Sequence, residues 1–120
     1  MINDSLVHTV LTCMHVLTPE ELSTTHNLCK VVSEEVTKKL KSPEYETENA
    51  VLDACAALVY YKFMLLEGLK SENIVSFKAG DIQVTEDYEM SLKNATLYRD
   101  NALSDASPYL VDVDFIFKSV

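Results

Sequence analysis

Two cysteine–histidine pairs have the residue types and spacing with the clearest potential for chemistry. Cys13 and His15 stand two positions apart, and His26 and Cys29 stand three positions apart. Thiolate and imidazole groups are the usual ligands of zinc in proteins. Residues two apart on a helix point about 200° away from each other, so only His26 and Cys29 share a face. We therefore expect no metal site, and we interpret these residues as buried cysteines and as exposed or hydrogen-bonded histidines.

The cysteines are also poorly placed for nucleophilic catalysis. All three, Cys13, Cys29 and Cys55, fall inside apolar helical patterns, where burial raises the pKa of a thiol and lowers its reactivity. An odd and sparse set is not a disulfide framework and indicates a reducing compartment. The chain has no nucleophile elbow or dinucleotide fingerprint, and its two glycines are too few for a phosphate-binding loop. We expect a protein that is not an enzyme and has no cofactor.

Carboxylates gather at several places, and paired carboxylates can perform acid–base catalysis. Such clusters more often form solvated faces or mark helix N-termini, and we prefer that interpretation. None has the spacing of a calcium-binding loop. The clusters are Glu34-Glu35, Glu44/Glu46/Glu48, Glu86/Asp87/Glu89 and Asp112/Asp114.

The overall charge excludes several classes of partner. The chain has 19 acidic and 10 basic residues and a net charge of −9. It therefore lacks the basic face that nucleic acids and anionic membranes require. Hydrophobic residues make up 48% of the 120 residues, enough for one core. With two glycines and three prolines, the composition predicts a single, mostly helical domain spanning residues 1–120.

Helical periodicity and capping signals predict the elements that must position these residues. The first helix is expected from Asp4 to Leu17, with its apolar stripe at Leu6, Val10, Cys13, Met14 and Leu17. The second opens with Thr18-Pro19-Glu20-Glu21, which has the pattern of a capping box with proline at the first helical position. Its expected buried face is Leu22, Thr25/His26, Cys29, Val32/Ser33, Val36 and Leu40. Lys38, Lys39 and Lys41 are expected in its last turn, where the helix dipole favours cations.

The third helix is predicted to lie at the centre of a four-helix bundle. It begins between Pro43 and Ala50 and runs to about Lys70, and its run from Ala54 to Val59 is apolar around most of the circumference. Its aromatic residues, Tyr60, Tyr61 and Phe63, fit core packing better than a recognition patch. The charges of Asp53 and Lys62 favour a buried soluble helix over a membrane span. A fourth helix is expected from about Thr85 to Asp105 or Ala106.

A β-hairpin is predicted between the third and fourth helices, over Ile74–Thr85. Apolar and polar residues alternate on both sides of Gly80-Asp81, which fits a two-residue type II′ turn. An isolated hairpin is marginally stable in water, so its apolar face must pack on the helices or on another subunit. We expect it to supply the interface with other subunits or partners through Val75, Phe77, Ala79, Gly80, Asp81, Ile82 and Val84. The tail from Val111 to Phe117 alternates in the same way and is expected to be a short strand or an extended arm.

These features together resemble a known family. The central alanine-rich helix with Tyr60-Tyr61, the segment from Ser76 to Val84, and Pro108-Tyr109-Leu110 followed by Phe115-Ile116-Phe117 are similar to head–tail connector proteins of tailed phages and prophages. These are also called head-completion or adaptor proteins. The distinctive part is the hairpin sequence Phe77-Lys78-Ala79-Gly80-Asp81, since the rest is generic helix.

The resemblance implies a structural subunit that assembles into a ring and docks to the portal or to other head–tail junction proteins. It implies that residues 74–85 form contacts between subunits or with the channel, and that the protein is found in the host cytoplasm and in the virion. The N-terminal residues Met1–Ser5 have no signal-peptide character, in line with a cytoplasmic protein. The alternative is a small protein-binding or regulatory module whose apolar groove takes a partner helix.

Overall fold

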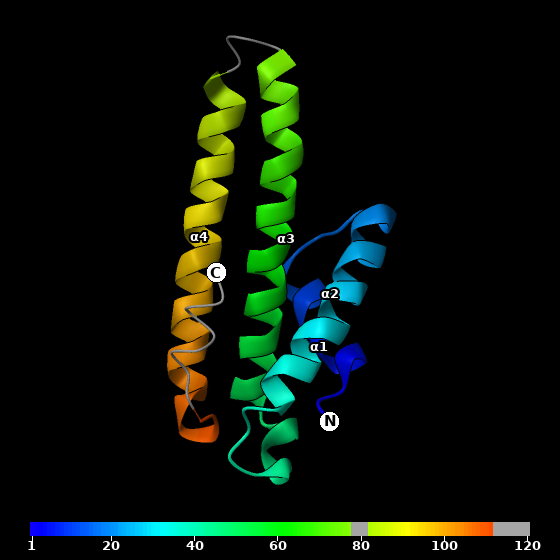
Figure 1. Cartoon of the computed structure of the whole chain (residues 1–120), viewed down its shortest axis with the longest axis vertical. Coiled ribbons are helices and arrows are strands. Elements are labelled where there is room, and N and C mark those ends of the chain that lie inside the picture. Colours follow the sequence, from blue (N-terminus) through cyan, green and yellow to red (C-terminus); the bar gives the residue numbers. More distant parts are fainter. Residues whose placement is uncertain (78–81, 112–120) are drawn as a thin grey trace.

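The computed structural model of the chain is mainly helical, as predicted (Figure 1). It describes the backbone of residues 1–77 and 82–111, and the side chains of residues 1–67 and 89–111. Within these ranges there are four α-helices, two short 3-10 helices and no strand. The helices are α1 (Asp4–Met14), α2 (Pro19–Thr37), η1 (Pro43–Thr47), α3 (Asn49–Phe77), α4 (Ile82–Ala106) and η2 (Ser107–Tyr109).

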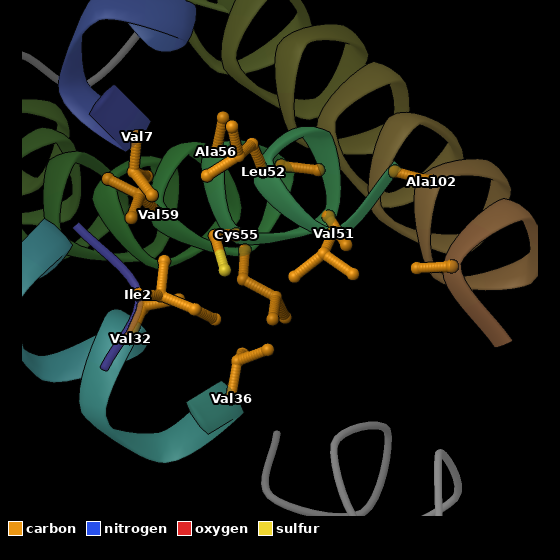
Figure 2. Packing of buried hydrophobic residues seen from close by; sticks show 14 of the residues in the cluster. Ile2, Val7, Val32, Val36, Val51, Leu52, Cys55, Ala56, Val59 and Ala102 are labelled. Atoms are coloured by element: carbon orange, nitrogen blue, oxygen red, sulfur yellow. The ribbon is translucent and has the colours of Figure 1, made fainter. Parts of the chain in front are cut away.

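Helix α3 is the central element, because α1, α2 and α4 all pack against it. Its apolar residues from Ala54 to Val59 are buried, with at most 3% of any side chain exposed. Figure 2 shows Cys55 of α3 among side chains from the chain start and α2. By length and mean hydropathy, 1.4, the segment Asn49–Glu67 would pass as a membrane span, but 56% of its most apolar window is buried inside the protein. This is the central helix that the sequence predicted.

The two N-terminal helices begin at side-chain caps. Asn3 Oδ1 accepts a hydrogen bond from the Ser5 N–H at 2.9 Å and so caps α1. The predicted capping box of α2 is confirmed: the Glu21 N–H donates to Thr18 Oγ1 at 3.2 Å, and the Thr18 N–H donates to Glu21 Oε1 at 3.0 Å. These bonds satisfy amide groups that the first turn leaves without helical partners. They fix the point where the chain turns from α1 into α2.

Two predicted helix ends were placed too late along the chain. Helix α1 ends at Met14 rather than Leu17, and α2 ends at Thr37. Lys38 is therefore the C-cap residue of α2, and Lys39 and Lys41 follow the helix instead of lying in its last turn. The lysines still stand beside the end of the helix where terminal carbonyl groups favour positive charge.

The predicted β-hairpin is wrong in the residues that the structure describes. Residues 74–77, expected as the first strand, form the last turn of α3, and residues 82–85 form the first turn of α4. Alternation over so few residues fits a strand or a helix equally well. Extending a helix that already exists costs little, whereas an isolated hairpin is marginal. Residues 78–81, which include the predicted turn, lie outside the described residues.

The C-terminal end of α2 is joined to the segment that follows η2. Leu40 and Leu110 form an isolated antiparallel bridge. The Val111 N–H donates to the Lys39 carbonyl at 2.7 Å, and the Lys41 N–H donates to the Tyr109 carbonyl at 2.9 Å. The predicted tail strand or arm falls almost entirely in residues 112–120, outside the described residues.

Helices α3 and α4 continue side by side past α1 and α2, as Figure 1 shows. The pair is antiparallel, and the Arg99 guanidinium lies over the Tyr61 ring at 4.2 Å. By this pairing, residues 68–77 of α3 face residues 82–91 of α4, and we call these two segments the helical arm. The molecule measures 51 × 29 × 19 Å with a radius of gyration of 15.1 Å. A compact chain of this length would have about 13.6 Å, so the arm makes the protein elongated.

Candidate functional site

The four predicted interface residues within the described backbone lie at the far end of the helical arm. Val75 and Phe77 are in the last turn of α3, and Ile82 and Val84 are in the first turn of α4. Their side chains are not among those described, and Ala79, Gly80 and Asp81 lie outside the described residues. The backbone therefore brings both halves of the predicted interface to one end of the molecule, on helices instead of strands.

The four residues considered as zinc ligands are divided among different environments. Cys13 is exposed on α1, whereas Cys29 is buried in the core. His15 lies against Tyr60, while His26 Nε2 faces Asp4 Oδ2 at 3.4 Å. Among the described residues no three histidine, cysteine or acidic side chains are grouped as metal ligands would be.

The buried cysteines have poor properties as nucleophiles. Burial raises the pKa of the Cys29 thiol to about 12, with a smaller contribution from the Asp4 carboxylate. Burial likewise raises the pKa of the Cys55 thiol to about 12. Both therefore stay protonated at neutral pH, and a neutral thiol is a weak nucleophile. Cys13 is the exception to the predicted burial, since its side chain is exposed.

A groove lies where the connection between α1 and α2 crosses α3. It is lined by Met14–Leu17, by Glu21 of α2, and by Tyr60, Phe63, Met64 and Glu67 of α3, and its volume is 460 Å³. We call it the loop groove. Val16 is fully exposed at its edge, and Met14 is 52% exposed. The groove therefore combines exposed apolar side chains with a concave surface, the combination found at many ligand sites.

His15 and Tyr60 both line the loop groove. The two rings are stacked, with centroids 3.8 Å apart and planes 3° from parallel. Tyr98 of α4 lies 6.2 Å from the His15 ring, and its hydroxyl contacts Met14 Sδ at 3.1 Å. Burial lowers the pKa of His15 and raises the pKa of Tyr98 to about 12. His15 Nε2 is buried and has no hydrogen-bond partner in the described part of the chain.

A second histidine cluster joins α1 to α2 on another face. The His8 and His26 rings are stacked at 5.2 Å, and His8 Nε2 lies 3.0 Å from the hydroxyl of the buried Thr25. Burial lowers the pKa of His8, and the nearby His26 lowers it further, while Asp4 opposes the shift. These contacts fit a structural role, because His8 and His26 each contact a polar residue of the neighbouring helix.

The loop groove is the feature that the sequence analysis missed. The signal that pointed to it was the apolar pair Val16-Leu17 in a predicted helix end just before the Thr18-Pro19 cap. A shorter α1 moves these residues into a connection, where apolar side chains are exposed unless something covers them.

The aromatic group of α3 was interpreted correctly in large part: Tyr61 and Phe63 are buried, and Tyr60 is half-buried.

Comparisons of the chain with protein-family models, with curated proteins and with solved structures found no match.

Proposed function

We propose that this chain is a subunit of a phage head–tail connector, which self-assembles into a ring and docks to the portal or to tail proteins. The observation that carries the proposal is the helical arm. Helices α3 and α4 run side by side past the rest of the fold (Figure 1) and bring residues 74–77 and 82–85 to one end of an elongated molecule. The family resemblance implicates this same segment in contacts between subunits.

The composition of the arm supports an assembly role. Its end is rich in apolar residue types, namely Ile74, Val75, Phe77, Ile82 and Val84. Where two helices pack only on each other, each buries one side and leaves the other facing outward. We infer that part of this apolar set is covered by a neighbouring subunit or by a docking partner.

The remaining chemistry also supports a structural role. The buried thiols of Cys29 and Cys55 are held in the protonated form by burial. The net charge of −9 suits a ring through which DNA passes without being held, because like charges repel. A ring whose lumen proved to be lined by lysine and arginine would contradict this part of the proposal.

Sedimentation velocity over a range of concentrations tests the proposal. We expect the full chain to form a closed oligomer, alone or when mixed with its portal protein. The double variant Phe77→Ser/Val84→Ser should lose assembly while keeping its helical circular dichroism. The matched control is Leu97→Ser, an exposed residue of α4 below the arm, which should assemble normally. If the double variant assembles normally, the end of the arm is not part of the interface.

The neighbouring genes give an independent test. A connector gene is expected beside the genes for the portal, the maturation protease and the major capsid protein. A gene surrounded by unrelated metabolic or regulatory genes would count against the proposal.

The loop groove favours a second candidate, a small module that binds a partner in an apolar groove. Its volume of 460 Å³ falls within the range of about 300–1,000 Å³ found for ligand pockets. The two candidates differ in oligomeric state. A chain that stays monomeric at high concentration with and without portal protein, and binds a foreign helix in the groove, would favour the module.

A further inference from the structure

The cluster around His8 and His26 supplies the polar contacts between α1 and α2. The two imidazole rings stack with their centroids 5.2 Å apart and their planes at 18°. His8 Nε2 lies 3.0 Å from Thr25 Oγ1, and His26 Nε2 lies 3.4 Å from Asp4 Oδ2. In the described part of the chain, these two are the only side-chain hydrogen bond and ion pair that join the two helices. The polar part of the α1–α2 contact therefore depends on four residues.

The hydrogen bonds of Thr25 determine which nitrogen of His8 carries the proton. The Thr25 hydroxyl has one hydrogen and donates it within its own helix, to the Glu21 carbonyl at 2.8 Å. Its oxygen therefore accepts from His8, which places the N–H of the neutral imidazole at Nε2. A second proton has to bind at Nδ1, for which the described residues provide no acceptor within hydrogen-bond distance. Protonation of His8 thus adds a charge without adding a bond to the protein.

The charges around His8 oppose a second positive charge in the cluster. Among the described residues, the charged or titratable groups that act on His8 are His26 of α2 and Asp4 of its own helix, and none comes from α3. The Cys29 thiol, which also lies near Asp4, is protonated and neutral. One carboxylate balances only one of two imidazolium ions, and two like charges at this separation repel each other. Accordingly, burial lowers the pKa of His8 and the neighbouring His26 lowers it further, while Asp4 opposes the shift.

We propose that the stacked pair of His8 and His26 is a proton-sensitive contact, which docks α1 on α2 at neutral pH and weakens that docking when both imidazoles are protonated. Helix α1 has 11 residues, a length at which an isolated helix is marginal in water, so its order depends on its contacts. Both histidines lie outside the helical arm, so this contact is independent of the proposed self-assembly.

The expected response is local opening of α1. Val7 and Leu11 still anchor the helix in the core, so the helix should open more often without the whole chain unfolding. Helix α1 also leads directly into Met14–Leu17, which line the loop groove. Weaker docking of α1 therefore changes one wall of that groove, and the pH of the surroundings would control it.

Amide hydrogen exchange of the full chain, followed by NMR between about pH 7 and pH 5, tests the contact. Exchange rates are divided by the intrinsic rates at each pH, which gives the opening constant of each amide. From the higher to the lower pH, the opening constants of residues 7–11 should rise about threefold to tenfold relative to those of residues 54–59 in α3, since a pKa difference of one unit changes such an equilibrium up to about tenfold. An equal rise in both helices would mean global unfolding and would overturn the proposal.

Three variants identify the groups responsible. His8→Gln removes the titration and keeps a side-chain N–H for Thr25, so the relative rise in α1 should disappear. His26→Gln removes the neighbouring charge, so the NMR titration midpoint of His8 should move upward and the relative rise should shrink. His15→Phe is the matched control, because it removes the histidine that lies outside the pair, and the relative rise in α1 should remain.

Three results would overturn the proposal. The first is a relative rise in α1 that is the same in His8→Gln as in the wild-type chain. The second is a His8 midpoint that His26→Gln leaves unchanged. The third is a rise that His15→Phe abolishes, which would assign the effect to the histidine of the loop groove. The comparison of α1 with α3 in the wild-type chain needs no variant, so it decides the matter even if a substitution disturbs folding.

Discussion

At the scale of single residues, two hydroxyl groups near the end of α2, those of Ser33 and Thr37, differ in their hydrogen bonding. Thr37 Oγ1 accepts a hydrogen bond from the Ile2 N–H at 2.9 Å and donates one to the Ser33 carbonyl at 2.6 Å. The Ser33 hydroxyl, one turn earlier, is fully buried and has no hydrogen-bond partner among the described residues. Thr37 therefore fastens the start of the chain to the end of α2, while the Ser33 hydroxyl adds no such bond.

This difference predicts opposite effects of two conservative substitutions. Thr37→Val should lower the free energy of unfolding by about 1–3 kcal/mol, because it leaves the buried Ile2 N–H without an acceptor. Ser33→Ala should be neutral or stabilising by up to about 1 kcal/mol. Urea denaturation measures both. Equal losses for the two variants would show that the assignment of these bonds is incorrect.

Two partly buried histidines, His8 and His15, predict how stability depends on pH. Burial lowers the pKa of His15 and of His8 below the usual 6.5, so the unfolded chain takes up protons at a higher pH than the folded chain. Stability from these groups is present above pH 6.5 and is lost as the pH falls toward their folded values. The free energy of unfolding should therefore fall between about pH 7 and pH 5.

His15→Phe keeps a ring against Tyr60 and removes the titration, so its stability should fall less steeply over that range. NMR titration of the wild-type imidazole signals gives the pKa values directly. Midpoints for His8 and His15 at or above 6.5 would contradict the burial that the structure gives them.

At the scale of elements, the features that depend only on residues close in sequence were predicted correctly. Thr18, Pro19 and Glu21 specify the start of α2 by themselves, because a capping box needs only neighbours in sequence. The buried face of α2 was also predicted in its centre, where Thr25, Cys29, Val32, Ser33 and Val36 are buried. Both signals depend on a few residues within one helix.

The buried face of α1 was predicted only in part: Val10 and Leu17 of the predicted stripe pack against the core. Val7 and Leu11 are buried, whereas Leu6, Cys13 and Met14 of the predicted stripe are exposed. The apolar residues of this short helix cover about half of its circumference, so periodicity alone does not decide which edge of that face meets α3. The packing of α3 decides it, and that information lies far away in the sequence.

The capping box yields a prediction about α2. Thr18→Ala should lower the free energy of unfolding by about 1 kcal/mol, since the Glu21 N–H loses its acceptor. Thr24→Ala is the matched control, because the Thr24 hydroxyl only returns to the Glu20 carbonyl of its own helix at 3.4 Å. Thermal or urea unfolding compares them. A control as destabilised as Thr18→Ala would argue against a capping effect.

The replacement of the predicted hairpin by helix gives a second prediction at this scale. Residues 74–77 and 82–85 should show the Cα chemical shifts of a helix in NMR spectra of the full chain. Strand-like chemical shifts in both segments would support the hairpin and contradict the helices. The sequence pattern misled here because alternating residues over four positions satisfy either period, and the long helices on both sides decide the outcome.

At the scale of the whole molecule, the helical arm and the loop groove are the two surfaces on which the proposed functions depend. The candidate groove was not predictable from sequence, because its walls come from the α1–α2 connection, α2 and α3 together. The segment predicted as a hairpin, residues 74–85, lies at the end of the arm, and its described residues are helical. An elongated shape with separate surfaces suits a subunit that is completed by its neighbours.

The most direct test of the connector proposal is electron microscopy of the full chain co-expressed with the portal protein from its own gene cluster. The proposal predicts a closed ring of this chain bound at one end of the portal, and loss of that ring in the Phe77→Ser/Val84→Ser variant. Portal particles without added density, together with a chain that remains monomeric at every concentration, would contradict it.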